Sequence, residues 1–302
     1  MLDIEKHAES IRNLIDGEVR VYELMREHTS FRIGGPADIF ALPESIEHIR
    51  QIISYARANE IPCHVIGSGS NLLVSDDGIR GITVRIGRGM SDVEFDDSEI
   101  KAQSGISLSG LSRIAAGHGL SGLEYGIGIP GTLGGAIVMN AGSHGQDIGQ
   151  VVSSVKILNA EEELAEIENA DSDFGYRNSR FRHSGEIVLE ARLQLQRGHE
   201  AAIKEKMREL MSRRRRMTPL NYPSAGSIFK NPEGDSAGRL IDQAGCKGMR
   251  KGDAQVSDLH ANWIVNPGQA KASDVLELIS CIQNAVQRKF GIQLELELSV
   301  LS

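Results

Sequence analysis

Residues 126–145 read GIGIPGTLGGAIVMNAGSHG and contain seven glycines in twenty positions. The stretch opens with Gly126, Gly128 and Gly131, which have the GxGxxG spacing of a Rossmann dinucleotide site. That motif requires a hydrophobic strand before the first glycine and a helix directly after the last one. The lead-in SGLEY is too short and too polar for a buried strand, and we expect no helix in the segment TLGGAIVMNAG. The context therefore argues against a Rossmann turn.

Glycine-rich backbone of this kind still suits a pyrophosphate, which can approach the main-chain N–H groups directly. A tightly turned loop with a purely structural role is the alternative. A second stretch, residues 65–81 (VIGSGSNLLVSDDGIRG), follows an apolar strand and places hydroxyl, amide and backbone donors in a row. A third, residues 28–38 (HTSFRIGGPAD), adds an arginine beside two glycines. Two polar glycine-rich loops in one chain favour a long ligand with a diphosphate.

Charge and composition exclude several other classes of protein. The 302 residues carry 33 basic and 41 acidic side chains, and this net charge of −8 argues against a general nucleic-acid binder. The three cysteines are far apart and form no CxxC pair, so neither a disulfide framework nor a metal site is predicted. The charged, amphipathic start does not resemble a secretory peptide, and no apolar run is long enough to span a membrane. We expect a cytoplasmic protein for which an oligomer is not required.

Hydrophobic periodicity predicts an α+β chain. Residues 37–43, 61–67 and 81–87 are expected to be strands, with a helix over residues 44–59, in a βαβ-like unit. Short β segments are expected from Asp92 to Ser104. A helix with Leu108, Leu111, Ile114 and Ala115 on its apolar side should follow.

Further along, residues 151–159 and 186–196 are expected to be strands, and residues 200–216 a helix. Ser273 and Asp274 can cap a later helix, whose buried stripe is predicted to be Val275, Leu278, Ile279, Ile282 and Val286. A final strand over residues 291–301 should turn Ile292, Leu294, Leu296, Leu298 and Val300 inward. Changes in pattern place boundaries near residues 87 and 210.

Six segments carry a resemblance to a known family. They are TSFRIGGPAD (29–38), IGSGSNLLVSDDGIRG (66–81), GIPGTLGGAIVMNAG (128–142), FGYRNSRF (174–181), AGSIFKNP (225–232) and HANWIVN (260–266). In this order, and spanning the chain from about Thr29 to Glu297, they resemble the UDP-N-acetylenolpyruvoylglucosamine reductase family. The compact FGYRNSRF region and the short chain are similar to the shorter, type II branch, which lacks an additional loop in the substrate domain.

The resemblance implies a fold and a reaction. It implies a two-subdomain FAD-binding region of the vanillyl-alcohol-oxidase/PCMH type at residues 1–87 and 88–209, and a C-terminal α+β substrate-binding domain at residues 210–302. It implies NADPH-dependent reduction of UDP-N-acetylglucosamine enolpyruvate to UDP-N-acetylmuramate through FAD, in peptidoglycan precursor biosynthesis. The alternatives are another FAD-dependent oxidoreductase of the same superfamily, acting on an alcohol or lactone, and a flavin- or nucleotide-binding protein that has lost catalysis.

Three residues match the catalytic positions of the family. Ser227 matches the proton donor, although by itself it would be interpreted as a turn serine. Arg177 matches the arginine that contacts the substrate carboxylate, and a planar guanidinium suits two oxygens side by side. Glu297 matches the glutamate that stabilises or helps protonate the enol. Leu296 stands where the family often has proline.

The resemblance also implies binding residues. The FAD-binding positions are Arg32, Gly67, Ser68, Gly69, Ser70, Asn71, Gly131, Thr132 and Gly134. The substrate-binding positions are Tyr176, Asn231, Lys247 and His260, of which His260 is equally interpretable as a structural histidine. His144 stands where relatives often have an aromatic residue, and the implied FAD is non-covalent. Residues 213–216 are four arginines. They either form a solvated cluster at the end of a helix, or one of them contacts the ligand.

Overall fold

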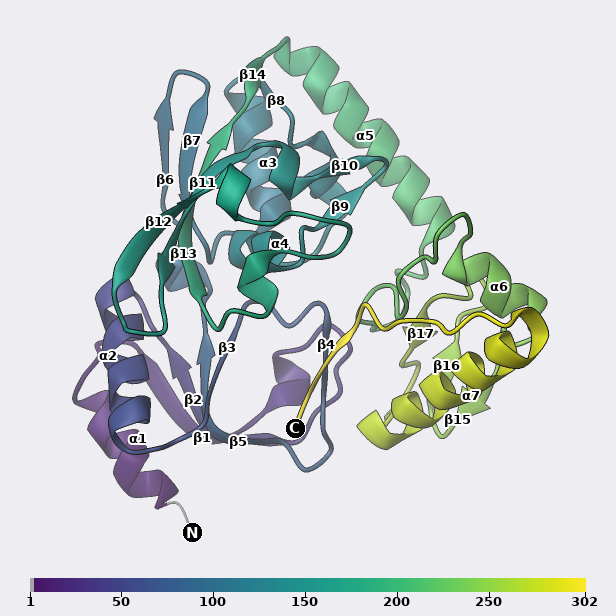
Figure 1. Ribbon diagram of the computed structural model, residues 1–302, viewed down its shortest axis with the longest axis horizontal. Coiled ribbons are helices and arrows are strands. Elements are labelled where there is room, and N and C mark those ends of the chain that lie inside the picture. The colour runs from purple at the N-terminus through teal and green to yellow at the C-terminus, as the bar shows by residue number, and fades with distance from the viewer. Residues whose placement is uncertain (1–2) are drawn as a thin grey trace. The chain divides into compact units, whose positions relative to one another are not determined.

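The computed structural model describes residues 3–302, and its contacts divide the chain into two units (Figure 1). Unit 1 comprises Met1–Val21, Ile39–Ser68 and Gly81–Arg214. Unit 2 comprises Tyr22–Asp38, Gly69–Arg80 and Arg215–Ser302. Two short early segments of the chain therefore belong with its C-terminal part. The division into three regions at residues 87 and 210 stays a prediction.

The first sheet contains the strands predicted near the N-terminus. Its order is β1 (Glu18–Leu24), β2 (Pro36–Leu42), β5 (Ile79–Arg85) and β3 (Cys63–Ile66), with β3 and β5 parallel. Two helices accompany it, α1 (Ile4–Arg12) and α2 (Ile46–Ala58). Helix α2 begins after Ser45, whose hydroxyl accepts a hydrogen bond from the His48 N–H, and it buries Ile49 and Ile52. The predicted strand–helix–strand unit is confirmed, with β5 lying between β2 and β3.

The larger sheet of unit 1 is antiparallel throughout. Its order is β12 (Leu164–Glu168), β11 (Val152–Leu158), β13 (Ile187–Gln194), β7 (Glu99–Gln103) and β6 (Val93–Asp96). Helices α3 (Leu108–Gly117), α4 (Leu133–Val138) and α5 (Glu200–Met217) belong to the same region of the chain. The strand predictions are confirmed here. In α3, the prediction is wrong for Ile114, which is exposed, because the helix buries Leu108, Leu111 and Ala115 on a narrower face.

Short elements connect these parts of unit 1. The paired short strands are β8 (Leu120–Ser121) with β14 (Gln196–Arg197), and β9 (Gly142–Ser143) with β10 (Gln146–Asp147). The 3₁₀ turns are η2 (Arg88–Met90), η3 (Glu124–Gly128), η4 (Ile148–Gln150), η5 (Asn169–Asp171) and η6 (Arg180–Arg182).

Unit 2 is built around one long helix. Helix α7 (Ala272–Phe290) lies beside α6 (Ala237–Gln243) and the small antiparallel sheet of β15 (Arg250–Lys251), β16 (Ala254–Val256) and β17 (Ile264–Val265) (Figure 1). Its predicted apolar stripe is confirmed, since all five residues are buried. The unit also contains η1 (Met25–Glu27) and a parallel pair, β4 (Leu72–Val74) with β18 (Ser299–Leu301).

Two predictions near the C-terminus are wrong. The strand expected over residues 291–301 is limited to β18, because residues 295–297 bond to residues 228–230 only through an isolated bridge, and Val300 is 43% exposed rather than turned inward. Helix α7 starts at Ala272 with Lys271 as its N-cap, before the predicted caps, and of these Asp274 does contribute, because its carboxylate accepts a hydrogen bond from the Lys271 N–H (3.0 Å). Asp76, from a distant part of the chain, accepts hydrogen bonds from the Ala272 N–H (2.7 Å) and the Ser273 N–H (3.1 Å). The carboxylate of Asp76 therefore helps to cap the N-terminus of α7.

Two kinds of feature are absent from the part of the chain that the structure describes. Within residues 3–302, no helix combines the length and apolar character needed to cross a membrane. The same range contains no group of three or more His, Cys, Asp and Glu side chains able to hold a metal ion.

Candidate functional site

In unit 1, two glycine-rich segments approach each other more closely than side chains would allow. Gly67 follows β3, and a Cβ atom placed on it would lie 2.3 Å from the Thr132 hydroxyl oxygen. Thr132 is the N-cap of α4, and its hydroxyl accepts a hydrogen bond from the Gly135 N–H (3.3 Å). Four predicted FAD positions therefore belong to one assembly: Gly67, Ser68, Gly131 and Thr132.

Helix α4 corrects the expectation that no helix follows the GxGxxG motif. Two adjacent glycines disfavour a helix by propensity, but α4 buries Leu133, Ala136 and Ile137, so tertiary packing outweighs propensity. Gly134 is buried, and a Cβ atom on it would lie 2.9 Å from the Ser104 Cβ. Before the motif, the residues form a 3₁₀ turn rather than a long strand. The strand-to-helix context of a Rossmann turn is therefore still absent.

Two buried hydroxyls of this assembly have no hydrogen-bond partner among residues 3–302. They are the side-chain oxygens of Ser68 and Ser104. The Ser104 carbonyl accepts a hydrogen bond from the Gly134 N–H (2.9 Å), which ties Ser104 to the start of α4. Buried hydroxyls are normally paired, so two unpaired ones beside close-packed glycines fit a bound polar ligand such as the expected FAD. Sequence reasoning missed Ser104, because a lone serine carries no signal of this kind.

Arg177 and Tyr176 lie together in unit 1. The Arg177 guanidinium donates to the Gly142 carbonyl (2.8 Å) and lies 5.2 Å from the centroid of the Tyr176 ring. The backbone at Arg177 has a φ of +54°, an uncommon value for a residue with a side chain. Buried Asn140 braces this turn by donating to the Gly175 carbonyl (2.8 Å). Asn140 therefore fixes the turn that carries Tyr176 and Arg177.

The four arginines at the end of α5 are not equivalent. Arg214 is half-buried and lies against Gly128, where a Cβ atom would approach its Cδ to 2.6 Å, whereas Arg213 is exposed. Burial lowers the pKa of the Arg214 guanidinium. His144 is largely exposed to solvent. The part of its ring that is covered, together with the charges of Arg213 and Arg214, lowers the pKa of His144. Arg214 is therefore not part of a fully solvated cluster, and a ligand contact by one of the four arginines stays a prediction.

In unit 2, a main-chain hydrogen bond links Glu297 to the residue that follows Ser227. Ser227 follows Gly226, which has a φ of +82°, and it forms an isolated bridge with Trp263. The Ile228 carbonyl accepts a hydrogen bond from the Glu297 N–H (2.9 Å). Two predicted catalytic positions, 70 residues apart in the sequence, are thus brought together.

Asn71 joins this pair. Its side-chain amide donates to the Glu297 carbonyl (3.0 Å), and its main-chain carbonyl accepts a hydrogen bond from the Ser299 N–H (3.0 Å). Gly69 has a φ of +65°, and a Cβ atom on it would lie 2.2 Å from the His28 carbonyl oxygen. The glycine-rich loop that begins in unit 1 therefore continues in unit 2 next to Glu297. Ser70 lies in the same turn.

Arg32 also belongs to unit 2. Its side chain is exposed and its φ is +53°. Asn266 is buried, and its amide donates to the carbonyls of Phe31 (3.1 Å) and Arg32 (3.4 Å). The amide oxygen of Asn266 accepts from the Ala270 N–H (3.0 Å). A buried asparagine therefore holds the turn that presents Arg32.

The remaining substrate positions surround α6. The Asn231 amide oxygen accepts a hydrogen bond from the Ala237 N–H (3.0 Å) at the start of the helix. The His260 ring lies against Gly238, whose hypothetical Cβ would be 2.9 Å from the His260 Cε1. Burial, and more weakly the charge of Lys247, lower the pKa of His260 against the opposing effect of a main-chain hydrogen bond. Lys247 itself is exposed and pairs with Asp242 (3.3 Å) beyond the other end of α6.

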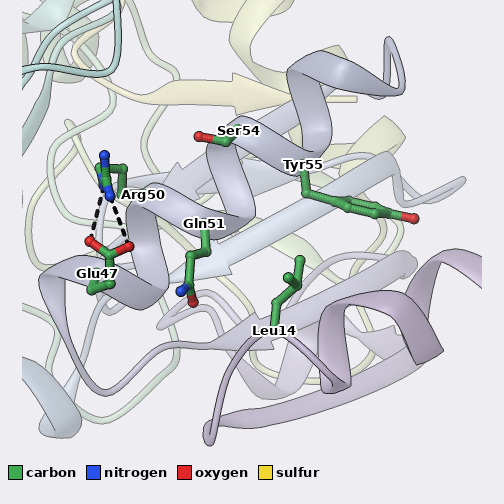
Figure 2. Close-up of a pocket in the computed structure, with 6 residues that line it drawn as sticks. All are labelled: Leu14, Glu47, Arg50, Gln51, Ser54 and Tyr55. Carbon is green, nitrogen blue, oxygen red and sulfur yellow. Dashed lines mark hydrogen bonds and ion pairs between the residues drawn. The ribbon is translucent and has the colours of Figure 1, made fainter.

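A hollow of about 360 Å³ in unit 1 is a separate feature (Figure 2). It is lined by Leu14, Glu47, Arg50, Gln51, Ser54 and Tyr55. Glu47 and Arg50 form an ion pair (3.0 Å) at its edge. None of the predicted site residues lines it, so it is not part of the candidate site.

Comparison with known proteins identifies the family. A model of the C-terminal domain of UDP-N-acetylenolpyruvoylglucosamine reductase matches residues 218–301, and a model of an FAD binding domain matches residues 37–168. The reductase of Desulforamulus reducens is 44% identical over 97% of this chain and 97% of its own. The reductase of Clostridium tetani is 42% identical over 96% of this chain and 94% of its own. The chain belongs to the UDP-N-acetylenolpyruvoylglucosamine reductase family.

Solved structures agree with this family assignment. The crystal structure of the reductase from Thermus caldophilus matches with a TM-score of 0.81 and 37% identity, covering 95% of this chain and all of that one. An alkyldihydroxyacetonephosphate synthase matches with a TM-score of 0.50 at 18% identity, which shows only a shared fold. The α+β fold of the vanillyl-alcohol-oxidase/PCMH type is thereby confirmed. As a member of the reductase family, the chain is an FAD-dependent oxidoreductase of peptidoglycan precursor synthesis.

Two asparagines of the family motif HANWIVN were missed as site residues. Asn262 and Asn266 are both buried and both make hydrogen bonds to segments that carry predicted site residues. The sequence contained a signal, since two asparagines four residues apart in an otherwise apolar segment must find partners when buried. Which segments they hold is visible only in the fold.

Proposed function

We propose that the chain catalyses the reduction of UDP-N-acetylglucosamine enolpyruvate to UDP-N-acetylmuramate, with NADPH as hydride donor and non-covalently bound FAD. The observation that carries the proposal is the convergence of Ser227, Glu297 and Asn71 in unit 2. When bound, FAD supplies the redox chemistry by accepting hydride from NADPH and passing it to the enolpyruvyl group. The protein must then stabilise negative charge on the substrate and deliver a proton.

The residues proposed to contact FAD are those that match the family motifs. In unit 1, Gly67, Ser68, Gly131, Thr132 and Gly134 offer close backbone approach, and Ser68 and Ser104 offer unpaired buried hydroxyls. In unit 2, Gly69, Ser70 and Asn71 continue the same loop, and Arg32 adds a cation on a turn whose main-chain carbonyl accepts from Asn266. We propose residues 1–87 and 88–209 as the two FAD-binding subdomains and residues 210–302 as the substrate-binding domain.

Proton delivery is assigned to Ser227. No hydrogen bond within unit 2 uses its hydroxyl, so the group can donate to the substrate carbon without first breaking an internal bond. A serine is a weak acid, but a substrate carbanion is basic enough to take its proton when the geometry is held. Glu297, whose main chain is fixed by Ile228 and Asn71, is proposed to stabilise or help protonate the enol.

Arg177 is proposed to bind the substrate carboxylate. A guanidinium carries five N–H donors in a planar fork that matches two carboxylate oxygens. One donor is directed to Gly142, and Tyr176 supports the plane of the group. Asn231, Lys247 and His260 around α6 are proposed to contact the nucleotide diphosphate part of the substrate. Neutral His260 would act there as a hydrogen-bonding group rather than as a cation.

Two measurements on the purified protein test the proposal. A yellow flavin spectrum is expected, and flavin should be released by denaturation if it is bound non-covalently. NADPH oxidation should depend on the enolpyruvyl sugar nucleotide. If the rate of NADPH oxidation is indifferent to that substrate, the proposed reaction is wrong, and an alcohol or lactone becomes the substrate class to test.

A further inference from the structure

Asn262 occupies an unusual place beside the Ser227 segment. Its side chain is 4% exposed and belongs to the turn that precedes β17. The amide oxygen accepts a hydrogen bond from the Phe229 N–H (3.0 Å), and the amide nitrogen donates to the Phe229 carbonyl (2.8 Å). The Asn262 main-chain carbonyl accepts from the Ile228 N–H (2.9 Å). One residue therefore makes three hydrogen bonds to the main chain of two consecutive residues, Ile228 and Phe229.

The side chain of Asn262 makes the hydrogen bonds to Phe229 that a neighbouring strand would otherwise make. A carboxamide has the donor and acceptor of a peptide group, so it can satisfy both main-chain groups of Phe229 as a neighbouring strand would. Phe229 is 1% exposed, so water cannot satisfy these groups instead. Leaving either buried group unpaired would cost about 1–3 kcal/mol.

The opposite edge of the same segment is held by the Glu297 region. The Ile228 carbonyl accepts from the Glu297 N–H (2.9 Å), and the Lys230 N–H donates to the Glu295 carbonyl (2.9 Å). Residues 228–230 are therefore fixed from two sides, by Asn262 and by residues 295–297.

Ser227 depends on this arrangement more than its neighbours do. The residue before it, Gly226, has a φ of +82° and no atom within 4 Å of its hypothetical Cβ, so no packing on that side fixes the turn. The Ser227 hydroxyl makes no hydrogen bond within unit 2. Its position is consequently set by its main-chain bridge with Trp263 and by the residues that follow it, Ile228 and Phe229, which Asn262 contacts.

We infer that Asn262 is a positioning residue for proton transfer by Ser227. The inference rests on the proposed function, in which Ser227 is the proton donor. A misplacement of about 1 Å in a reacting group can cost about 100-fold in rate. Loss of the Asn262 carboxamide should therefore slow the proton-dependent half-reaction and leave the reduction of flavin by NADPH intact.

The test uses the flavin-loaded protein with the variants Asn262→Leu and Asn262→Asp. Leucine keeps the side-chain volume and removes both hydrogen bonds to Phe229, whereas aspartate keeps the acceptor and loses the donor. We expect flavin reduction by NADPH to stay within about twofold of the original protein, and reoxidation by the enolpyruvyl substrate to fall at least about 10-fold. Amide hydrogen exchange at Phe229, measured without substrate, should accelerate.

A control and a double variant separate positioning from general damage. Val286→Ala removes buried volume from α7 in the same core and should lower stability without a selective effect on reoxidation. In a Ser227→Ala background, Asn262→Leu should have no further effect on reoxidation, because a positioning residue acts only through its partner.

The outcomes distinguish this inference from the proposed function. If Ser227→Ala does not selectively slow reoxidation, the proton-donor role itself fails. If Ser227→Ala does so but Asn262→Leu slows both half-reactions equally, or adds its full effect to Ser227→Ala, only the positioning role is overturned. Failure of both Asn262 variants to fold would assign Asn262 a structural role alone and would also overturn the inference.

Discussion

In unit 1, Gly67 and Gly134 allow neighbouring segments to pack closely because they lack side chains. In unit 2, by contrast, the carboxamides of Asn262 and Asn71 make hydrogen bonds to the segments that carry Ser227 and Glu297. The glycine positions have no room for a Cβ atom. The Asn262 carboxamide both accepts and donates a hydrogen bond at Phe229, and the Asn71 carboxamide donates one to Glu297. Substitutions should therefore act by overpacking in the first region and by unpaired polar groups in the second.

The largest effect is expected from Ser227→Ala, which removes a reacting group without disturbing the backbone that carries it. Reoxidation of reduced flavin by substrate should fall about 10²–10⁴-fold, the usual contribution of a positioned acid. Flavin reduction by NADPH should be unchanged, as measured by stopped-flow absorbance of each half-reaction. Equal losses in both half-reactions would remove Ser227 from the role of proton donor.

Gly134→Ala tests the region held by bare backbone. Its new Cβ would lie 2.9 Å from the Ser104 Cβ, and overpacking of this kind costs about 1–3 kcal/mol of the free energy of unfolding. Urea unfolding monitored by circular dichroism measures this loss.

The adjacent Gly135 provides the matched control for Gly134→Ala. It lies in the same helix, is exposed, and its hypothetical Cβ would be 3.5 Å from the Thr132 hydroxyl oxygen. Gly135→Ala should be neutral or stabilising by up to about 1 kcal/mol, because alanine favours a helix. Equal destabilisation by the two substitutions would mean that close packing at Ser104 is not what requires glycine.

Asp76→Ala tests the long-range cap of α7 and should cost about 1 kcal/mol, the usual value for loss of an N-cap. Partial burial raises the pKa of Asp76, but hydrogen bonds from Ala272 and Ser273 and the charge of Lys271 outweigh it, so the pKa lies below its ordinary value of 3.8. A lowered folded-state pKa adds stability above the unfolded pKa, and this contribution disappears as pH falls through the folded value.

The difference in unfolding free energy between the original protein and Asp76→Ala should therefore be constant from about pH 7 to about pH 5 and shrink below about pH 4. Asp77→Ala is the control, because Asp77 is exposed and only its main chain makes hydrogen bonds in this loop. A loss of stability in Asp77→Ala as large as that in Asp76→Ala would contradict the cap.

The smallest effect concerns His260. Lys247→Met should raise the pKa of His260, because the charge of Lys247 adds to burial in lowering it. The titration of the His260 ring by nuclear magnetic resonance measures the shift. His64 in unit 1, whose pKa is lowered by burial, should titrate as before. An unchanged His260 pKa would show that the charge of Lys247 does not influence the His260 ring.

Periodicity predicted the elements whose burial is local to the sequence. Helix α2, the stripe of α7 and the strands β11 and β13 follow from the spacing of their apolar residues, and all are confirmed. Helix α4 was missed because its stability comes from packing against distant residues rather than from its own propensity. The C-terminal strand was overextended because alternation shows which residues are buried, not whether a partner strand pairs with them.

The sequence by itself determined the α+β class, the order of the family motifs and the chemical types available at the candidate site. Those properties depend on residue identity and on short-range spacing. Only the tertiary structure decided that Asn71 contacts Glu297, that Asn262 holds Phe229 and that Asp76 caps α7. Each of these contacts joins segments that are 33 to 226 residues apart, and a hydrogen bond over such a separation depends on the fold that brings its partners together.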